Sequence, residues 1–451
     1  KGANSVAGNT ALGESALDAS VSGGNNTAIG KEALTALTSG TNNVGLGYQA
    51  LASNTTGGTN TAVGSNALDA NTTASNNTAV GNAALGANTT GSQNVAVGKE
   101  ALAANTTAAN NVGVGDRAGK DITTGTQNTF VGGAVGFATT TANDNTAVGY
   151  FALGANTTAD NNTALGSLAL SANTTGASNV AVGASALLTN TTGAANCAGG
   201  VDALKFNTTA NDNTAWGFSS LRENTTGANN TAVGRTALLV NTTGSDNTAV
   251  GKNALDANTT ATENSAFGSD ALGATTTGVA NTGIGAGALR ACTTGETNTA
   301  VGRNALYDLT DQDNATALGS SAGENAVGTN NVFCGFTAGK GASSGCNGDS
   351  NTAVGKGAYV AFTTGRNNTC IGIQAGEALT TGQNNLFLGR NSGTASSPNG
   401  IHVSDSNRIV LGDNNITDAH IKVSFTATSD ERDKADIADF TKGLDFVNAL
   451  R

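Results

Sequence analysis

One short alternation of apolar and polar positions recurs along most of the chain. In the copy at 60–64 it is N-T-A-V-G, followed by Ala-Leu at 67–68 and Asn-Thr-Thr at 71–73. The closing glycine recurs at a constant period of 17, from Gly13, Gly30 and Gly47 through to Gly319. A fixed period held over so many copies is typical of stacked-repeat proteins, in which each repeat packs only against its neighbours.

The phrase before each glycine predicts a short strand. Residues two apart point to the same side of a strand, so the first and third positions, as in 61–63, share one face. These positions hold the larger residues, and we expect them to point into the core, with the middle Ala outside. Trp216 and Phe267 hold third positions, where either the core must widen or the ring must face a neighbouring chain.

The second half of the repeat is less regular. Ala-Leu supplies a second buried contact, and a phrase such as 99–104 is compatible with one helical turn or with a second short strand. The N-T-T-G phrase predicts a turn, because Asn and Gly tolerate positive φ. Gly119, Gly136 and Gly323 replace the Leu, and those repeats should lose an apolar contact.

Stacking places equal positions above one another and predicts a ladder of asparagine amides. Its members are Asn60, Asn77, Asn94 and Asn111. Such ladders satisfy buried amides from coil to coil, and this structural role is favoured over the alternative of a polar ligand surface. The N-x-T sequons are interpreted as turn residues rather than as glycosylation sites; they include Asn54, Asn71, Asn88 and Asn105.

These features predict a mainly β protein, an elongated parallel β-solenoid or β-roll of 17-residue repeats. The predicted organisation is the end of a preceding coil (1–12), a regular shaft (13–319), irregular repeats (320–392), a β connector (393–428) and the start of a further domain (429–451). The first and last phrases of the chain suggest a piece of a longer product. Small core residues bury little area per chain, so association would add stability.

The irregular part carries its own expectations. A protruding loop is expected at 340–350, and strands are expected at 401–403, 408–411 and 421–425. The residues 429–451 are rich in charge, and their apolar residues recur at helical spacing, which predicts a short helical segment.

Composition excludes several classes of function. The net charge is −11 and no basic stripe is present, so nucleic-acid binding is not expected. No apolar run is long enough to insert into a membrane. No Ser/His/Asp or paired-carboxylate arrangement emerges from the repeats, so we expect no external substrate.

Cysteine and histidine add little chemistry. Cys197 and Cys334 are expected in core positions, and a Cys334–Cys346 bridge is left open. His402 and His420 are the only histidines and form no H-x-H pair, so neither a metal nor a cofactor is predicted.

Two resemblances refine this picture. The N-T-A-V-G phrase resembles the coil motif of the β-roll heads of trimeric autotransporter adhesins, and the longer period is more similar to repeats of phage tail-fibre proteins. Both families form trimers, so the resemblance implies a homotrimer.

The segments 428–434 and 443–451 resemble the start of the C-terminal intramolecular chaperone domain of phage tail spikes and fibres. That family trimerises, templates the fibre before it and releases itself by autocleavage. The resemblance implies a cut between Thr428 and Ser429, with Ser429 as nucleophile and Lys434 as its base. Thr428 and Glu431 also fit a helix capping box, and the two interpretations are compatible.

The resulting functional expectation is a structural fibre of a phage-type tail appendage, located on the virion or outside the cell. It would attach to a glycan or protein receptor on the host surface through several weak contacts. The alternative is a cellular trimeric surface adhesin. An ice-binding solenoid is a remote alternative, because the Thr residues of the repeat are adjacent rather than two apart.

Overall fold

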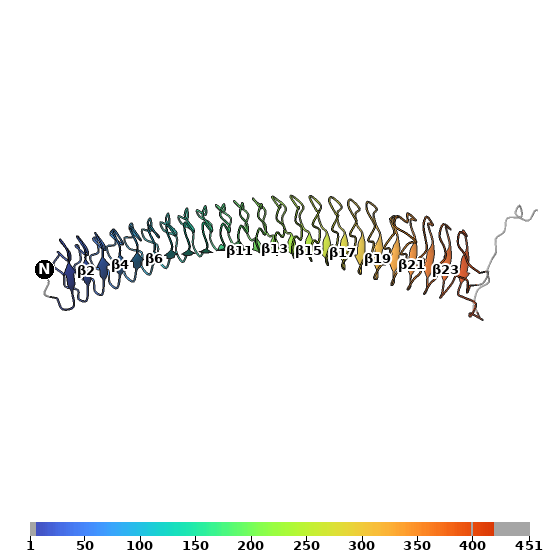
Figure 1. The fold of residues 1–451 in the computed structure, drawn as a ribbon, viewed down its shortest axis with the longest axis horizontal. Helices are drawn as coiled ribbons and strands as arrows, with labels where there is room; N and C mark the ends of the chain where they lie inside the picture. Colours follow the sequence, from blue (N-terminus) through green and yellow to red (C-terminus); the bar gives the residue numbers. More distant parts are fainter. Residues whose placement is uncertain (1–5, 398–399, 419–451) are drawn as a thin grey trace, which may run out of the picture. The chain divides into compact units, whose positions relative to one another are not determined.

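The computed structural model describes residues 6–397 and 400–418. The chain divides into two units, 1–413 and 414–451. In the second unit only 414–418 are described, and they form neither helix nor strand. The described part of the first unit contains short strands in one 24-stranded sheet, and no helix (Figure 1).

Each coil contributes one strand. The strands are β1 (Thr10–Leu12), β2 (Thr27–Ile29), β3 (Val44–Leu46), β4 (Thr61–Val63), β5 (Thr78–Val80), β6 (Val95–Val97), β7 (Val112–Val114), β8 (Thr129–Val131), β9 (Thr146–Val148), β10 (Thr163–Leu165), β11 (Val180–Val182), β12 (Cys197–Gly199), β13 (Thr214–Trp216), β14 (Thr231–Val233), β15 (Thr248–Val250), β16 (Ser265–Phe267), β17 (Thr282–Ile284), β18 (Thr299–Val301), β19 (Thr316–Leu318), β20 (Val332–Cys334), β21 (Thr352–Val354), β22 (Thr369–Ile371), β23 (Leu386–Leu388) and β24 (Ile409–Leu411).

Consecutive strands pair in parallel and in register, so that Ala62 lies opposite Ala79 and Val63 opposite Val80. Figure 1 shows the coils following one another in chain order. The predicted parallel β-solenoid is thereby confirmed. The number of residues from one strand to the next is constant up to β19. It is slightly smaller before β20 and larger before β21 and before β24. All of these strands still pair in register, so the stack absorbs insertions within a coil.

The prediction of which strand face is buried is wrong. The middle residue of β4, Ala62, is fully buried, whereas Thr61 and Val63 are only partly covered. The reason is the thinness of the coil. At β7 the middle residue is glycine, and a Cβ added to Gly113 would lie 2.8 Å from Cγ of Leu102 on the opposite wall. Leucine from the second half of the repeat fills the core, and only a small residue fits across from it.

The Ala-Leu phrase forms neither a helical turn nor a strand. Ala67 and Leu68 are fully buried, as expected, but Leu68 has a φ of 51°, which no right-handed helix accommodates. The segment is a chain of turns, in which the N–H of Asn71 donates to the carbonyl of Leu68.

The glycines that replace this Leu do not leave the core short of contacts. Phe130 takes the middle position of β8 and is fully buried. A Cβ on Gly119 or Gly136 would lie within 2.8 Å of its ring. Phe333 of β20 has the same relation to Gly323. The expected loss of apolar contact is therefore wrong, because one phenylalanine replaces the leucines of two neighbouring turns.

The closing glycine is required by the approach of successive coils. Gly64 has a φ of 135°, and a Cβ there would lie 2.5 Å from the carbonyl oxygen of Gly81. Real Cβ atoms do not come so close to backbone, and L-residues avoid this region of φ. Each closing glycine thus makes room for the backbone of the next coil.

The cysteines occupy positions other than those predicted. Cys197 and Cys334 lie in the outer positions of their strands and are partly exposed, because the buried face is the opposite one. Cys292, Cys346 and Cys370 are buried instead, and all five thiols are free, so no Cys334–Cys346 bridge forms. Burial raises the pKa of Cys292 to about 11, which keeps this thiol protonated.

The stack extends beyond the predicted end of the repeats. β24 pairs in register with β23, so residues up to 411 form a further coil. The strand predicted at 401–403 is absent from the described structure, and that predicted at 421–425 lies outside the described residues. The loop expected at 340–350 is partly folded in, because Cys346 is buried and forms an isolated bridge with Ala326.

Candidate functional site

The residues predicted for autocleavage are Thr428, Ser429 and Lys434. All three lie outside the described residues, as does the predicted helical segment at 429–451. Autocleavage at these residues therefore stays a prediction from the sequence.

The predicted asparagine ladder forms a buried column, which we call column one. Asn60, Asn77, Asn94 and Asn111 are fully buried. The backbone N–H of each donates to Oδ1 of the asparagine one coil before, at 2.9 to 3.0 Å. The Nδ2 of Asn60 also donates to the carbonyl of Ala74 at 2.8 Å. Buried and hydrogen-bonded in this way, these amides offer no surface to a ligand.

A second column of asparagines was missed by the sequence interpretation. Asn54, Asn71, Asn88 and Asn105, taken above as turn residues, are fully buried. The Nδ2 of each later member donates to Oδ1 of the one before, at 3.0 Å. We call this column two. The signal for it was the recurrence of the first asparagine of N-T-T with the same period, and these buried amides are not accessible to glycosylation.

The outward face of the sheet is the first surface that could carry function. Its third strand positions are apolar or uncharged from β1 to β24, and we call them the outer row. Its members are Leu12, Ile29, Leu46, Val63, Val80, Val97, Val114, Val131, Val148, Leu165, Val182, Gly199, Trp216, Val233, Val250, Phe267, Ile284, Val301, Leu318, Cys334, Val354, Ile371, Leu388 and Leu411. The first strand positions carry no charge either.

The bulkiest member of the outer row has space made for it. Trp216 of β13 points outward and is 53 % exposed, and Phe267 also points outward, so the core does not widen at either position. A Cβ on Gly199, opposite Trp216 in β12, would lie 2.4 Å from the indole ring. The ring thus lies over a glycine instead of standing above the row.

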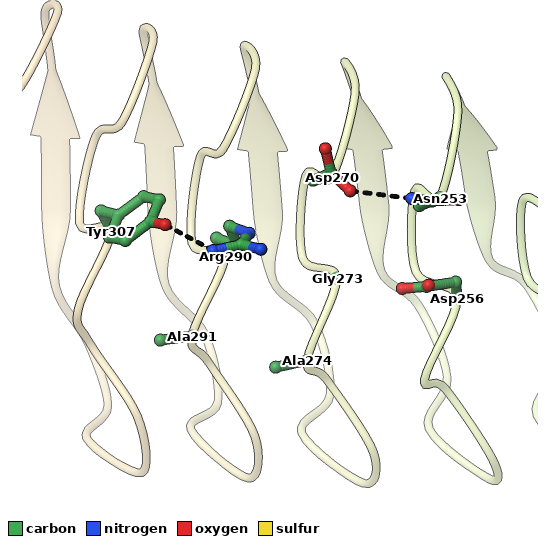
Figure 2. A pocket seen from close by; sticks show the side chains of 8 residues that line it. All are labelled: Asn253, Asp256, Asp270, Gly273, Ala274, Arg290, Ala291 and Tyr307. Carbon is green, nitrogen blue, oxygen red and sulfur yellow. Dashed lines mark hydrogen bonds between the residues drawn. The ribbon is translucent and has the colours of Figure 1, made fainter.

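A hollow in the side of the stack is the second such surface (Figure 2). Its volume is about 390 Å³, and it lies where Gly273 has no side chain. The same position of the repeat holds Asp256 one coil earlier and Arg290 one coil later. Asn253, Asp270 and Tyr307 complete the polar lining.

The two carboxylates of this hollow differ in their surroundings. Nδ2 of Asn253 donates to Asp270 at 3.0 Å, and the hydroxyl of Ser269 donates to it at 2.9 Å. The bond from Asn253 is the main reason that the pKa of Asp270 is lowered. No described side chain donates to Asp256, and burial raises the pKa of that carboxyl.

The cationic side of the hollow is held by an aromatic ring. Nη1 of Arg290 donates to the hydroxyl of Tyr307, and its guanidinium lies 5.6 Å from the centre of that ring. Figure 2 shows the two side chains joined in this way, away from Asp256. Arg290 forms no ion pair among the described residues, so its remaining N–H groups are available.

The described part of the chain contains neither a cluster of metal-ligating side chains nor a membrane-spanning helix. No group of three or more His, Cys, Asp or Glu side chains there could hold a metal ion. Nδ1 of His402 lies 2.6 Å from Asp405, and His420 is not described. Among the residues that the structure covers, no helix is long and apolar enough to cross a membrane.

No protein-family model matches the chain, and no curated protein matches it.

Proposed function

We propose that this chain is the shaft of a phage-type tail fibre that attaches to a host surface, and that it works as a homotrimer joined along the outer row. The observation that carries the proposal is the unbroken uncharged face of the sheet, which extends over all 24 strands. An exposed apolar strip of that extent marks an association surface.

Two features of this face support association with copies of the same chain. Monomeric soluble proteins rarely expose a long contiguous apolar patch, and here the first and third strand positions carry no charge. In addition, Trp216 lies over Gly199, which keeps the row level enough to pack against another level row. The three-fold number comes from the family resemblances.

The rest of the coil suits a load-bearing shaft. Strand pairing joins every coil to the next. Along most of the stack, at least one buried side-chain ladder also joins neighbouring coils. Such a stack holds a binding surface at a distance from its anchor and presents many copies of one surface side by side. Both properties favour multivalent attachment to a cell surface.

The oligomer is tested by sedimentation equilibrium of the purified chain. We expect the mass of a trimer for the wild type and a smaller mass for Val148→Lys combined with Val233→Lys, because each lysine places a charge in the outer row. Thr226→Lys with Thr243→Lys is the matched control, since these turn residues are exposed and lie away from the sheet. A monomeric wild type would contradict the proposal.

Attachment itself is tested with fluorescently labelled protein and a panel of bacterial strains. The expected result is saturable labelling of the surface of at least one strain by the trimer. Labelling of none would count against the attachment role while leaving the shaft intact.

The proposed self-processing has its own test. The hydroxyl oxygen of Ser429 would attack the carbonyl carbon of Thr428 while Lys434 takes the serine proton. The Thr428–Ser429 C–N bond would then break as the Ser429 nitrogen receives that proton from Lys434, which leaves an ester between the two residues. Water would hydrolyse this ester to a carboxylate on Thr428 and restore the hydroxyl of Ser429. We expect the intact mass of the denatured wild-type chain to end at Thr428 and that of Ser429→Ala to continue beyond it. Equal masses that extend past Ser429 in both proteins would remove the serine–lysine proposal.

A further inference from the structure

The hollow at Gly273 has the features of a binding site for a small polar molecule. In most coils the position after the buried leucine carries a side chain, for example Asp256, Arg290 and Tyr307. At Gly273 that side chain is missing, and the neighbours on either side are Asp256 and Arg290. These two residues are two coils apart, roughly 10 Å at about 4.8 Å per coil. The gap is as wide as one missing layer of side chains.

The charges that remain unused in the hollow have opposite signs and lie on opposite walls. Asp270 already accepts two hydrogen bonds, so its capacity is largely taken. Asp256 accepts hydrogen bonds only from its own backbone N–H and that of Ala257, so its carboxylate can accept more. Arg290 keeps most of its five N–H donors after bonding Tyr307. The wall with Asp256 can accept hydrogen bonds and the wall with Arg290 can donate them.

A ligand for this hollow must therefore be uncharged overall and must both donate and accept hydrogen bonds. An anion would face two carboxylates, and a cation would face the guanidinium. Because the hollow is open to solvent, single charge pairs contribute little there, and the number of hydrogen-bonding groups decides the fit. We propose that the hollow binds one uncharged pyranose ring of a polysaccharide, with ring hydroxyls donating to Asp256 and Arg290 donating to a sugar oxygen. This inference rests on the proposed attachment to a host surface and names the kind of molecule bound.

The molecule contains its own comparison for this site. A second hollow, of about 520 Å³, lies at Gly86, which holds the same position of the repeat. In this second hollow, Asp69 lies at the same repeat position one coil before the glycine, as Asp256 does in the first hollow. Ala103 takes the position of Arg290, and Ala83 takes the position of Asp270. Asp69 also accepts a hydrogen bond from Nδ2 of Asn66 at 3.3 Å. The missing side chain is thus common to both hollows, whereas the pair of unused groups belongs to the hollow at Gly273.

The two glycines permit a matched pair of variants. An added Cβ would have its closest contact at 3.3 Å at Gly273 and at 3.4 Å at Gly86, and neither glycine has a positive φ. Leucine occupies the same position at Leu188 and Leu239, so the coil accepts that side chain. Gly273→Leu should fill one hollow and Gly86→Leu the other without loss of fold, which thermal melting would verify.

The experiment is saturation-transfer NMR on the whole protein with methyl glycosides of glucose, galactose, mannose, N-acetylglucosamine and rhamnose. We expect transfer to at least one glycoside, its loss in Gly273→Leu, and no change in Gly86→Leu. Asp256→Ala should weaken the binding of that glycoside by about tenfold, the value of one hydrogen bond to a charged group. Glucuronate and serine serve as anionic and zwitterionic probes, and neither should compete.

The outcomes separate this inference from the proposed function. Transfer to none of the glycosides, transfer that survives Gly273→Leu, or competition by serine would each overturn the saccharide site. If the wild type labels cells and Gly273→Leu labels them equally well, attachment stands and the site fails. If a glycoside binds at Gly273 but no cells are labelled, the site stands and the attachment role fails.

Discussion

The two asparagine columns use the same residue at the same period, but they respond differently to interruption. In column one, Oδ1 accepts the backbone N–H of the next coil, a donor that every residue except proline supplies. Where the column meets Ala315, the N–H of that alanine still donates to Oδ1 of Asn298 at 2.9 Å. At its C-terminal end, the N–H of Arg408 donates to Asn385 in the same way.

In column two, Oδ1 accepts only a side-chain amide. Ile122 and Thr139 interrupt the column after Asn105, and Thr275 ends it after Asn258. The Oδ1 atoms of Asn105 and Asn258 and the hydroxyl of Thr139 are then buried without a hydrogen-bond partner. A buried polar atom left in this state costs roughly 1–3 kcal/mol. A ladder whose acceptors receive backbone N–H groups therefore tolerates sequence changes, whereas one made of side chains alone leaves an unsatisfied oxygen on the last asparagine of each run.

The largest expected effect comes from breaking column one within the array. Asn77→Ala removes the acceptor of the buried N–H of Asn94 and the donor to Gly91. We expect local stability to fall by about 3 kcal/mol. Asn88→Ala in column two also removes a donor to Gly91, but it leaves no backbone N–H without its acceptor and should cost less. Hydrogen exchange by mass spectrometry measures both, because a solenoid opens coil by coil. Equal losses would show that the two columns do not differ in this way.

The next effect comes from joining the two parts of column two. Ile122→Asn would donate to Asn105 and accept from the hydroxyl of Thr139, which offsets much of the lost burial of isoleucine. We expect a cost below about 1.5 kcal/mol, although burying a polar group without partners usually costs more. Leu309→Asn is the control. It is buried at the same repeat position, between Cys292 and Ala326, and should cost at least about 3 kcal/mol. Equal shifts in melting temperature would refute the orphaned-atom interpretation.

A smaller change in stability is expected when a substitution extends column two by one coil without satisfying its last oxygen. Thr275→Asn would donate to Oδ1 of Asn258 but would itself place an unpartnered Oδ1 one coil further on, and it would lose the bond from Thr275 to Cys292. We expect stability within about 0.5 kcal/mol of the wild type. Exchange rates in the coil of Asn258 provide the measurement, and a gain as large as that from satisfying a buried acceptor would contradict the argument.

The smallest effect concerns pH, to which neither column responds because amides do not titrate. Asp256 does titrate, and burial raises its folded-state pKa above the ordinary aspartate value of about 3.9. A raised aspartate pKa destabilises the folded state at neutral pH, and this penalty is relieved as pH falls from the folded-state pKa through the ordinary aspartate pKa. Asp256→Asn should therefore melt slightly higher than the wild type at neutral pH, with the difference vanishing as the pH approaches the ordinary aspartate pKa. A difference that grows as pH falls would reverse the sign.

The sequence predicted the architecture because its main cause is local. The closing glycine and the strand phrase recur in each regular repeat, and so does the column-one asparagine except at Ala315. A period of 17 permits few arrangements other than one coil per repeat. The hollow at Gly273 could not be predicted in this way. Its walls are Asp256 and Arg290, which lie two repeats apart in the sequence. The position after the buried leucine varies from repeat to repeat, so neither residue is unusual there.

By itself the sequence determined the period, the strands, the turns and the existence of an amide ladder, since these follow from the conformational preferences of short segments. Only the tertiary structure decided which strand face is buried. Alternation shows that Thr61 and Val63 share a face, but the space left by Leu68 and its equivalents decides that Ala62 points inward. The same fit between coils decides that Phe130 replaces two leucines and that the apolar outer row faces outward. The volume available in a thin core is set by residues of other turns and coils.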